Sequence, residues 1–201
     1  GQDGPSQMAL EDLAALRAVY GSTVLYPCDA HQTGKLVAAM ADREGISYLR
    51  TTRGDTPVIY TPDDEFVIGG SRVLRSSPND VVTLVAAGVT VFEALTAADQ
   101  LAEDGIAARV IDLYSLKPID AETLVTAARE TGRIITIEDH WPQGGLGDAV
   151  LGVFAEGGPV PPLVKLAVRD MPGSATPEQQ LRLAGIDADE IYTTARRFVT
   201  R

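Results

Sequence analysis

The sequence predicts an α/β protein in which a mostly parallel sheet carries helices on both faces, in three layers. After residue 66, short apolar segments alternate with longer amphipathic ones, as in a strand–helix repeat. The short segments are rich in valine, isoleucine and leucine, which is typical of parallel strands buried on both faces. The residues before this repeat hold too few elements for a complete domain, so we expect the remainder of a second α/β domain there.

The composition is that of a folded, acidic protein. Of the 201 residues, 45% are hydrophobic and 22% are charged, which argues against a disordered chain, and the net charge is −11. This acidic balance disfavours nucleic acids and anionic membranes as partners, because both require a positive face. The sole cysteine, Cys28, cannot form a disulfide within the chain, which fits the cytoplasmic location that we expect.

The apolar runs and the first residues carry no targeting signal. The longest apolar run, Val81–Phe92, is too short to cross a bilayer. The opening string GQDGPSQ lacks the basic start and the apolar stretch of a signal peptide. It also lacks an initiator methionine, so we expect a processed product or a piece of a longer protein.

The first part of the chain ends at a predicted boundary. Asp3-Gly4-Pro5 is turn chemistry, and Ser6 is expected to cap the helix that follows. The segment Thr61–Glu65 is polar, acidic and proline-bearing, so we expect domains at 1–65 and 66–201. The elements expected in the first domain are helices over Met8–Val19 and 30–43, and strands over Ser22–Tyr26, Ile46–Arg50 and Val58–Tyr60.

The second domain shows a more regular alternation, and its crossovers are expected to be right-handed. The strands expected there are Phe66–Leu74, Val81–Ala86, Arg109–Leu113, Arg133–Ile137 and Leu163–Val168. The helices expected there are Thr90–Glu103, Ala121–Thr131, Gly147–Ala155, Glu178–Leu183 and Asp189–Phe198.

The turn at the start of the chain is one candidate binding site. It offers Asp3, Ser6, Gln7 and backbone N–H groups at the expected helix start. The helix dipole favours an anion or developing negative charge at that point. Plain capping of the helix is the alternative interpretation.

Arg53 is a second candidate. It lies in the polar loop Arg50–Asp55, directly after a predicted strand, and open α/β sheets bind ligands beyond the carboxyl ends of their strands. Its guanidinium group has the donor geometry that matches phosphate or carboxylate. The alternative is a surface ion pair between Arg53 and Asp55.

Three further features are interpreted as structural. Gly88 fits a tight turn, and the sequence has no complete G-x-G-x-x-G fingerprint. Glu138–Trp141 and the glycine-rich residues after it suggest acid–base chemistry, but a loop that hydrogen-bonds itself is favoured, and one histidine with two acids makes no zinc site. A nucleophile built from Cys28 and His31 is disfavoured, because small buried cysteines are usually inert.

Read in order, several strings resemble the transketolase family. The string GQDGPSQMALEDLAALRAV is similar to the family's GEDGPSQ-type motif. The strings that follow in the family's order are YPCDA, ISYLRTTRGDTPVIY, VTLVAAGVTVFEAL, IDLYSLKPID and GRIITIEDHWPQGGLGDAV. This resemblance spans nearly the whole chain, and it implies the end of a pyrimidine-binding domain followed by a transketolase C-terminal domain.

The resemblance also implies an activity and a set of site residues. Transketolases transfer a two-carbon ketol unit from a ketose phosphate to an aldose phosphate, using thiamine diphosphate and a divalent cation, Mg or Ca. Asp3 matches the family aspartate that contacts the donor hydroxyls, and Arg53 matches the arginine that grips the sugar phosphate. Gln7 stands where the family has a histidine or glutamine near the cofactor and substrate.

Other family residues have no counterpart in this sequence. It has no GDG-type motif for diphosphate and metal, no upstream activating glutamate or aromatic cofactor clamp, and no histidine before GQDGP. We therefore expect no catalytic and no metal-ligating residue in this fragment. On its own it is expected to be inactive and to bind no cofactor.

Related alternatives remain open at the level of sequence. The RGD loop and WPQGG each favour one of two sister families, 1-deoxyxylulose-5-phosphate synthase and the 2-oxoacid dehydrogenase beta subunit, whereas GQDGPSQMALEDLA and IEDH favour transketolase. A non-catalytic assembly module is an alternative of a different class. Transketolases work as dimers, so the expected partners are a second copy and, for the full-length enzyme, sugar phosphates.

Overall fold

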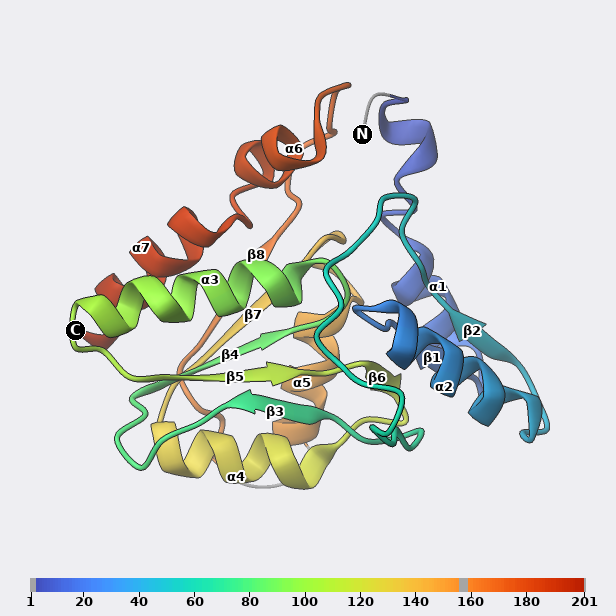
Figure 1. The fold of residues 1–201 in the computed structure, drawn as a ribbon, viewed down its shortest axis with the longest axis horizontal. Helices are drawn as coiled ribbons and strands as arrows, with labels where there is room; N and C mark the ends of the chain where they lie inside the picture. The colour runs from blue at the N-terminus through green and yellow to red at the C-terminus, as the bar shows by residue number, and fades with distance from the viewer. Residues whose placement is uncertain (1–2, 156–158, 201) are drawn as a thin grey trace.

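A computed structural model describes residues 3–155 and 159–200 of the chain (Figure 1). The strand order of the larger sheet is β3-β5-β4-β7-β8, in which β3 pairs antiparallel at one edge and the other pairs are parallel. These strands are β3 (Arg72–Arg75), β4 (Val82–Ala86), β5 (Ala108–Asp112), β7 (Ile134–Glu138) and β8 (Leu163–Ala167). The predicted α/β class with a mostly parallel sheet is therefore confirmed.

Helices cover both faces of this sheet, which makes three layers (Figure 1). Leu84 and Ala86 contribute to a core shared with α3 and α7, whereas Val85 contributes to a second core shared with α4 and α5. Side chains alternate along a strand, so β4 supplies both cores and is buried along its whole length. The helices are α3 (Thr90–Glu103), α4 (Ala121–Thr131), α5 (Leu146–Ala155), α6 (Pro177–Ala184) and α7 (Ala188–Val199).

The first part of the chain forms a smaller sheet in the order β2-β1-β6. β1 (Thr23–Leu25) runs parallel to β2 (Ser47–Leu49), and the helices of this part are α1 (Asp12–Ala18) and α2 (Ala30–Ala41). The third strand, β6 (Ser115–Lys117), comes from the second part and pairs antiparallel with β1. The sequence pattern predicts no strand at these three residues. The two parts of the chain therefore share a sheet.

The first helix, predicted over Met8–Val19, is shorter in the structure. Residues Pro5–Gln7 form one 3₁₀ turn, and α1 begins only at Asp12. Between them Ala9 has φ of 46°, in the left-handed region, which interrupts a right-handed helix. The prediction that Ser6 caps this helix is wrong, because the residue that precedes α1 is Glu11.

Two predicted strands also differ from the structure. The segment Val58–Tyr60 is not a strand, because the N–H groups of Ile59 and Tyr60 donate to the Asp29 carboxylate at 2.9 and 2.8 Å. Of the predicted strand Phe66–Leu74, only the end joins the sheet, as β3. Phe66 instead packs edge-on between Tyr60 and Tyr114, with ring centroids 4.7 and 5.4 Å away.

None of the helices in the described ranges combines the length and hydrophobicity that crossing a bilayer requires.

Candidate functional site

The structure brings two of the predicted site residues together. Asp3 precedes the 3₁₀ turn, and Arg53 lies in the loop after β2, yet their side chains form an ion pair. The side chains are 48% and 85% exposed, so both remain available to a ligand from solvent. The sequence had offered Asp55 as the partner of Arg53, but the structure pairs Arg53 with Asp3. Gly1 and Gln2 of the motif lie outside the described residues.

Gln7 ends the 3₁₀ turn, on the same short segment as Asp3. Its N–H donates to the carbonyl of Gly4 at 3.3 Å, and φ of 76° at Gly4 suits a residue without Cβ. The side chain of Gln7 is exposed. The prediction of a helix start with a favourable dipole at this position is wrong, because a three-residue 3₁₀ turn replaces the helix. What the segment offers a ligand is therefore its side chains.

The loop after β7 docks onto the segment that carries Gln7. The N–H of Trp141 donates to the carbonyl of Leu10 at 3.2 Å, and its indole N–H donates to Glu11 at 2.8 Å. His140 is fully buried, and its Nε2 accepts from the N–H of Ala14 at 3.3 Å. These contacts fit the structural interpretation of this string, and they attach the predicted site to the larger sheet.

The glycine-rich residues allow the backbone to approach a buried carboxylate. Glu138 accepts from the N–H groups of Leu146 and Gly147 at 2.6 and 3.1 Å, at the start of α5. Burial raises the pKa of Glu138 to about 7, although these donors and Lys165 lower it. A Cβ on Gly145 would overlap this carboxylate. The loop therefore hydrogen-bonds itself and leads into α5.

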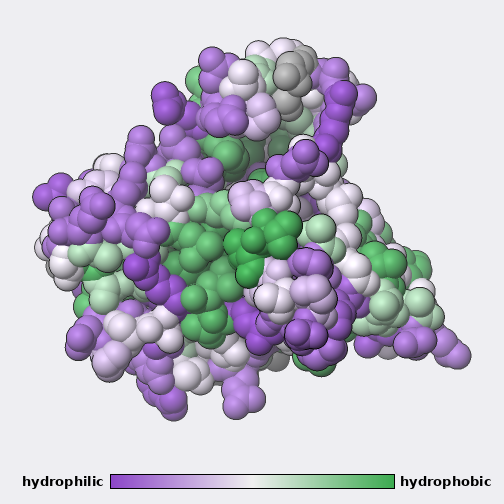
Figure 2. Space-filling model, in the orientation of Figure 1, coloured by the Kyte–Doolittle hydropathy of each residue, from purple (hydrophilic) through white to green (hydrophobic). Residues whose placement is uncertain are grey.

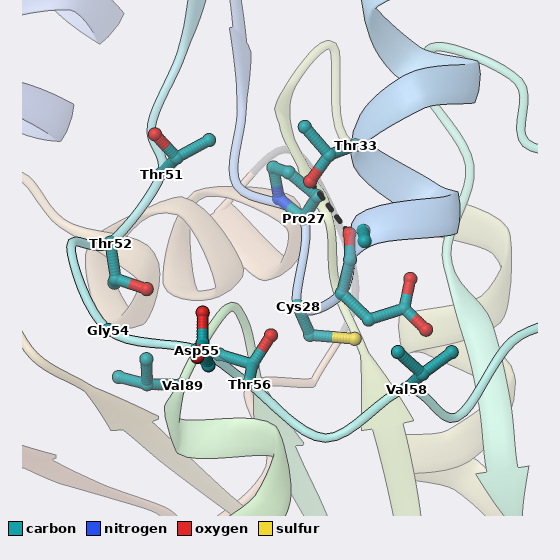
Figure 3. Close-up of a pocket in the computed structure, with 12 residues that line it drawn as sticks. Pro27, Cys28, Thr33, Thr51, Thr52, Gly54, Asp55, Thr56, Val58 and Val89 are labelled. Atoms are coloured by element: carbon teal, nitrogen blue, oxygen red, sulfur yellow. Dashed lines mark hydrogen bonds between the residues drawn. The ribbon is translucent and has the colours of Figure 1, made fainter.

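A cavity of about 370 Å³ is lined in part by the neighbours of Arg53 in the loop after β2 (Figure 3). Thr51, Thr52 and Asp55 of the loop after β2 face Cys28 and the start of α2. Hydroxyl and carboxylate groups suit a neutral or hydroxyl-bearing ligand better than an anion. Arg53 belongs to the same loop, but it does not line this cavity in the described residues.

Cys28 is buried at the wall of this cavity and is not activated. Burial, together with the nearby carboxylates of Asp112 and Asp29, raises the pKa of its thiol. The thiol donates to Asp112 at 3.6 Å. Because the thiolate is the nucleophilic form, this environment fits the structural interpretation of Cys28.

The buried cluster around Asp112 was missed by sequence reasoning. Asp112 is fully buried at the end of β5, and its Oδ2 accepts from Gln32 at 2.7 Å and Tyr60 at 2.8 Å. Within the described residues no donor reaches its Oδ1. Burial raises the pKa of Asp112 to about 6. An acidic residue ending the apolar string ARVID was the available signal.

Gly88 has the packing role expected of it. Its φ of 57° is left-handed, and a Cβ there would overlap the ring of Tyr26. Tyr26 is fully buried at this junction between the two parts of the chain. Gly88 therefore provides room for an aromatic ring at that position.

The residues that the structure describes supply no metal site. Across 3–155 and 159–200, no group of three or more His, Cys, Asp or Glu side chains could hold a metal ion. A divalent cation such as Mg²⁺ is held largely through carboxylates and phosphate oxygens. The described residues therefore do not fit the cation that the family resemblance implies.

Comparison with known proteins identifies the family. The model of the transketolase C-terminal domain matches residues 71–191, and that of the transketolase pyrimidine binding domain matches residues 1–58. Transketolase-like protein 1 of Bos taurus is 46% identical over the whole chain, which covers 34% of that relative. Transketolase of Mus musculus is 44% identical over the whole chain, which covers 32% of it.

A solved structure described as "Split gene transketolase, inactive beta4 tetramer" has the same fold. Its TM-score is 0.87 at 41% identity, over 95% of this chain and 61% of that chain. This chain spans about a third of the length of the curated relatives it matches. Two family models in the expected order and relatives of this identity together show that the chain belongs to the transketolase family.

Proposed function

We propose that this chain forms the sugar-phosphate-binding part of a transketolase. The complete enzyme transfers a two-carbon ketol unit from a ketose phosphate to an aldose phosphate. In this proposal Arg53 binds the phosphate, Asp3 accepts hydrogen bonds from substrate hydroxyls, and Gln7 lies close to substrate and cofactor. The observation that carries the proposal is the contact of Asp3 with Arg53, which places a carboxylate and a guanidinium side by side at the surface.

The cofactor is proposed to be held by another part of the enzyme. Thiamine diphosphate, bound with a divalent cation, supplies the electron sink for cleavage of the carbon–carbon bond. The described residues contain no suitable cluster for the cation, so the proposal places the metal site in another part of the enzyme. It gives this chain no catalytic residue, as the family resemblance implies. Its contribution is to bind and orient the sugar phosphate.

An activity assay with added components tests this proposal. The purified chain, with thiamine diphosphate and Mg²⁺, is expected to show no ketol transfer between a ketose phosphate and an aldose phosphate. Adding the diphosphate-binding part of a transketolase as a separate chain is expected to produce turnover. Full turnover by the chain alone would refute the division of roles.

Substitution of Arg53 tests the phosphate assignment in the assembled enzyme. Arg53→Ala is expected to raise KM for the phosphorylated acceptor about tenfold or more, because it removes a charge-assisted contact. The KM for an acceptor without phosphate should change little. Arg75→Ala is the matched control, because Arg75, which lies on β3, also forms an ion pair with an aspartate, Asp99, at 2.6 Å. Equal effects on both acceptors would remove Arg53 from the phosphate site.

Substrate choice separates the sister families. A transketolase is expected to use ketose phosphates as donors, whereas turnover of pyruvate would favour 1-deoxyxylulose-5-phosphate synthase or a 2-oxoacid dehydrogenase. The same assembled enzyme serves for both measurements.

We also propose that the chain associates with a second copy in the cytoplasm. Figure 2 shows a hydrophobic area near the centre of one face, over the first turns of α3 and the strands beneath it. The solved relative at 41% identity is described as a tetramer, which supports association here. Sedimentation at several concentrations is expected to show dimers or larger species. A monomer at every concentration would argue against association and leave the enzymatic proposal standing.

A further inference from the structure

The guanidinium group of Arg50 is buried where three segments of the chain meet. Its side chain is only 7% exposed. Its Nε pairs with the carboxylate of Asp12 at 3.3 Å, and its Nη1 pairs with that of Asp139 at 3.2 Å. Its Nη2 donates to the carbonyl of Asp139 at 3.0 Å. The forked donors of one side chain thus connect the end of β2, the start of α1 and the end of β7.

Arg50 also contacts the turn that carries Gln7. Its Nη2 lies 3.4 Å from the carbonyl oxygens of both Met8 and Ala9, the two residues after Gln7. Ala9 has the left-handed φ of 46°, which costs about 1 kcal/mol or more for a residue with a Cβ. A conformation of this kind persists only where its surroundings enforce it, and Arg50 donates to the carbonyl of this residue.

Arg50 stands three residues before Arg53 and begins the loop that carries it. Arg50 therefore connects the loop of Arg53 to the turn of Asp3 and Gln7. Asp139 attaches both to the larger sheet, and Tyr26 supports Asp139 by donating its hydroxyl at 2.9 Å. The ring of Tyr26 lies 4.7 Å from the Arg50 guanidinium carbon, in a cation–π contact.

The guanidinium stays charged in this environment. Burial alone would lower the pKa of Arg50, but the negative charge of Asp139 and Asp12 outweighs it and raises that pKa above its ordinary value. A lysine would keep the charge and lose the planar fork that reaches several acceptors at once.

We propose that Arg50 is a positioning residue that holds the turn of Asp3 and Gln7 at a set distance from Arg53, with Asp139 orienting its guanidinium group. The nature of the ligand rests on the proposed function, whereas the positioning itself rests on these contacts. Arg50 does not touch substrate in this proposal; it acts through Arg53 and Gln7.

Amide hydrogen exchange in the chain tests the positioning directly. Arg50→Lys is expected to speed exchange at least tenfold in residues 4–10 and 51–56, and to leave exchange in β4 and β7 nearly unchanged. Asp139→Asn is the milder variant: the backbone carbonyl of residue 139 still accepts from Arg50, so a smaller effect in the same segments is expected. This second variant keeps the test valid if Arg50→Lys fails to fold.

Arg109→Lys is the matched control. Arg109 is also largely buried and pairs with two carboxylates, Asp80 at 3.4 Å and Glu130 at 2.7 Å, but it lies on β5 away from these loops. If Arg50→Lys and Asp139→Asn speed exchange uniformly, or no more than Arg109→Lys does in residues 4–10 and 51–56, Arg50 is a general stabilising residue and the proposal is overturned.

Kinetics of the assembled enzyme give the second readout. Arg50→Lys is expected to raise KM for the phosphorylated acceptor several-fold, with a smaller rise for an acceptor without phosphate. If exchange changes as expected but the wild-type assembly shows no ketol transfer, the proposed function fails and the positioning role stands. If exchange changes and KM for both acceptors stays the same, the loops are positioned for something other than the phosphate, and the proposed link to Arg53 is overturned.

Discussion

At the scale of single residues, the buried carboxyl of Asp112 is the group with the clearest consequence for pH dependence. Burial raises its folded-state pKa to about 6, above the ordinary aspartate value, so folding favours the protonated form. This contribution to the free energy of unfolding is fully present below about pH 4 and is lost as pH rises through about 6. Between pH 4 and pH 7, the free energy of unfolding of Asp112→Asn is expected to fall by about 1 to 3 kcal/mol less than that of the wild type. Urea unfolding of both proteins across that range provides the measurement.

Glu138 contributes to the pH dependence of the free energy of unfolding in the same direction, because its pKa is raised to about 7. The test is therefore the difference between wild type and variant, and Glu138→Gln serves as the comparison. Parallel pH profiles for wild type and Asp112→Asn would show that Asp112 ionises normally in the folded protein.

At the scale of elements, the glycine-rich entry to α5 depends on close packing against Glu138. In Gly145→Ala the added Cβ overlaps the carboxylate that accepts from the first N–H groups of α5. The expected loss of unfolding free energy is about 2 to 4 kcal/mol, as for other overpacked or unsatisfied sites. Gly152→Ala is the matched control, because Gly152 is exposed within α5 and its added Cβ meets open space. That control is expected to stabilise by up to about 1 kcal/mol. Equal midpoints for both variants in thermal unfolding would contradict the role given to Gly145.

At the scale of the whole molecule, the proposed domains 1–65 and 66–201 share their cores. One core contains Leu36 and Tyr60 together with Val82, and the other contains Leu13 together with Leu124. The two family models leave residues 59–70 between them, and the proposed boundary falls in that interval. Because both cores take residues from both parts of the chain, we expect a single cooperative unfolding transition.

The sole tryptophan reports on the junction of the two parts. Trp141 follows β7 and contacts Leu10 and Glu11 of the first part. Its fluorescence and the far-UV circular dichroism are expected to change at the same urea concentration. An earlier change in fluorescence would show that the parts separate before they unfold, which would count against a shared core.

Regular elements were predictable where the local pattern was strong. The strand at Val81–Ala86 and the helix at Thr90–Glu103 appear within a residue of their predicted bounds, because each is a long apolar or amphipathic run. β6 was not predictable, since its three residues have no pattern and its partner β1 lies about ninety residues earlier. The break at Ala9 was hidden because apolar residues on both sides of it, Met8 before and Leu13 and Leu16 after, lie at near-helical spacing.

The candidate site was likewise predictable in its local signals and not in its long-range contacts. Local composition indicated Asp3, Gln7 and Arg53 as candidates, and family resemblance added their expected roles. The contact between Asp3 and Arg53 joins positions 50 residues apart, so no local signal contained it. Arg50 was passed over because a buried arginine and an exposed one look the same in a sequence.

The α/β class, the order of most elements in the second part and the chemistry available in the candidate loops can all be predicted from local sequence. Apolar periodicity and turn residues act over a few neighbouring positions, so they can be read along the chain. Three features become visible only in the folded chain: Arg50 and Asp139 join the two parts, β6 completes the smaller sheet, and Asp112 is buried with one oxygen unpartnered among the described residues. These features depend on distant segments meeting, and burial and hydrogen-bond partners exist only once they have met.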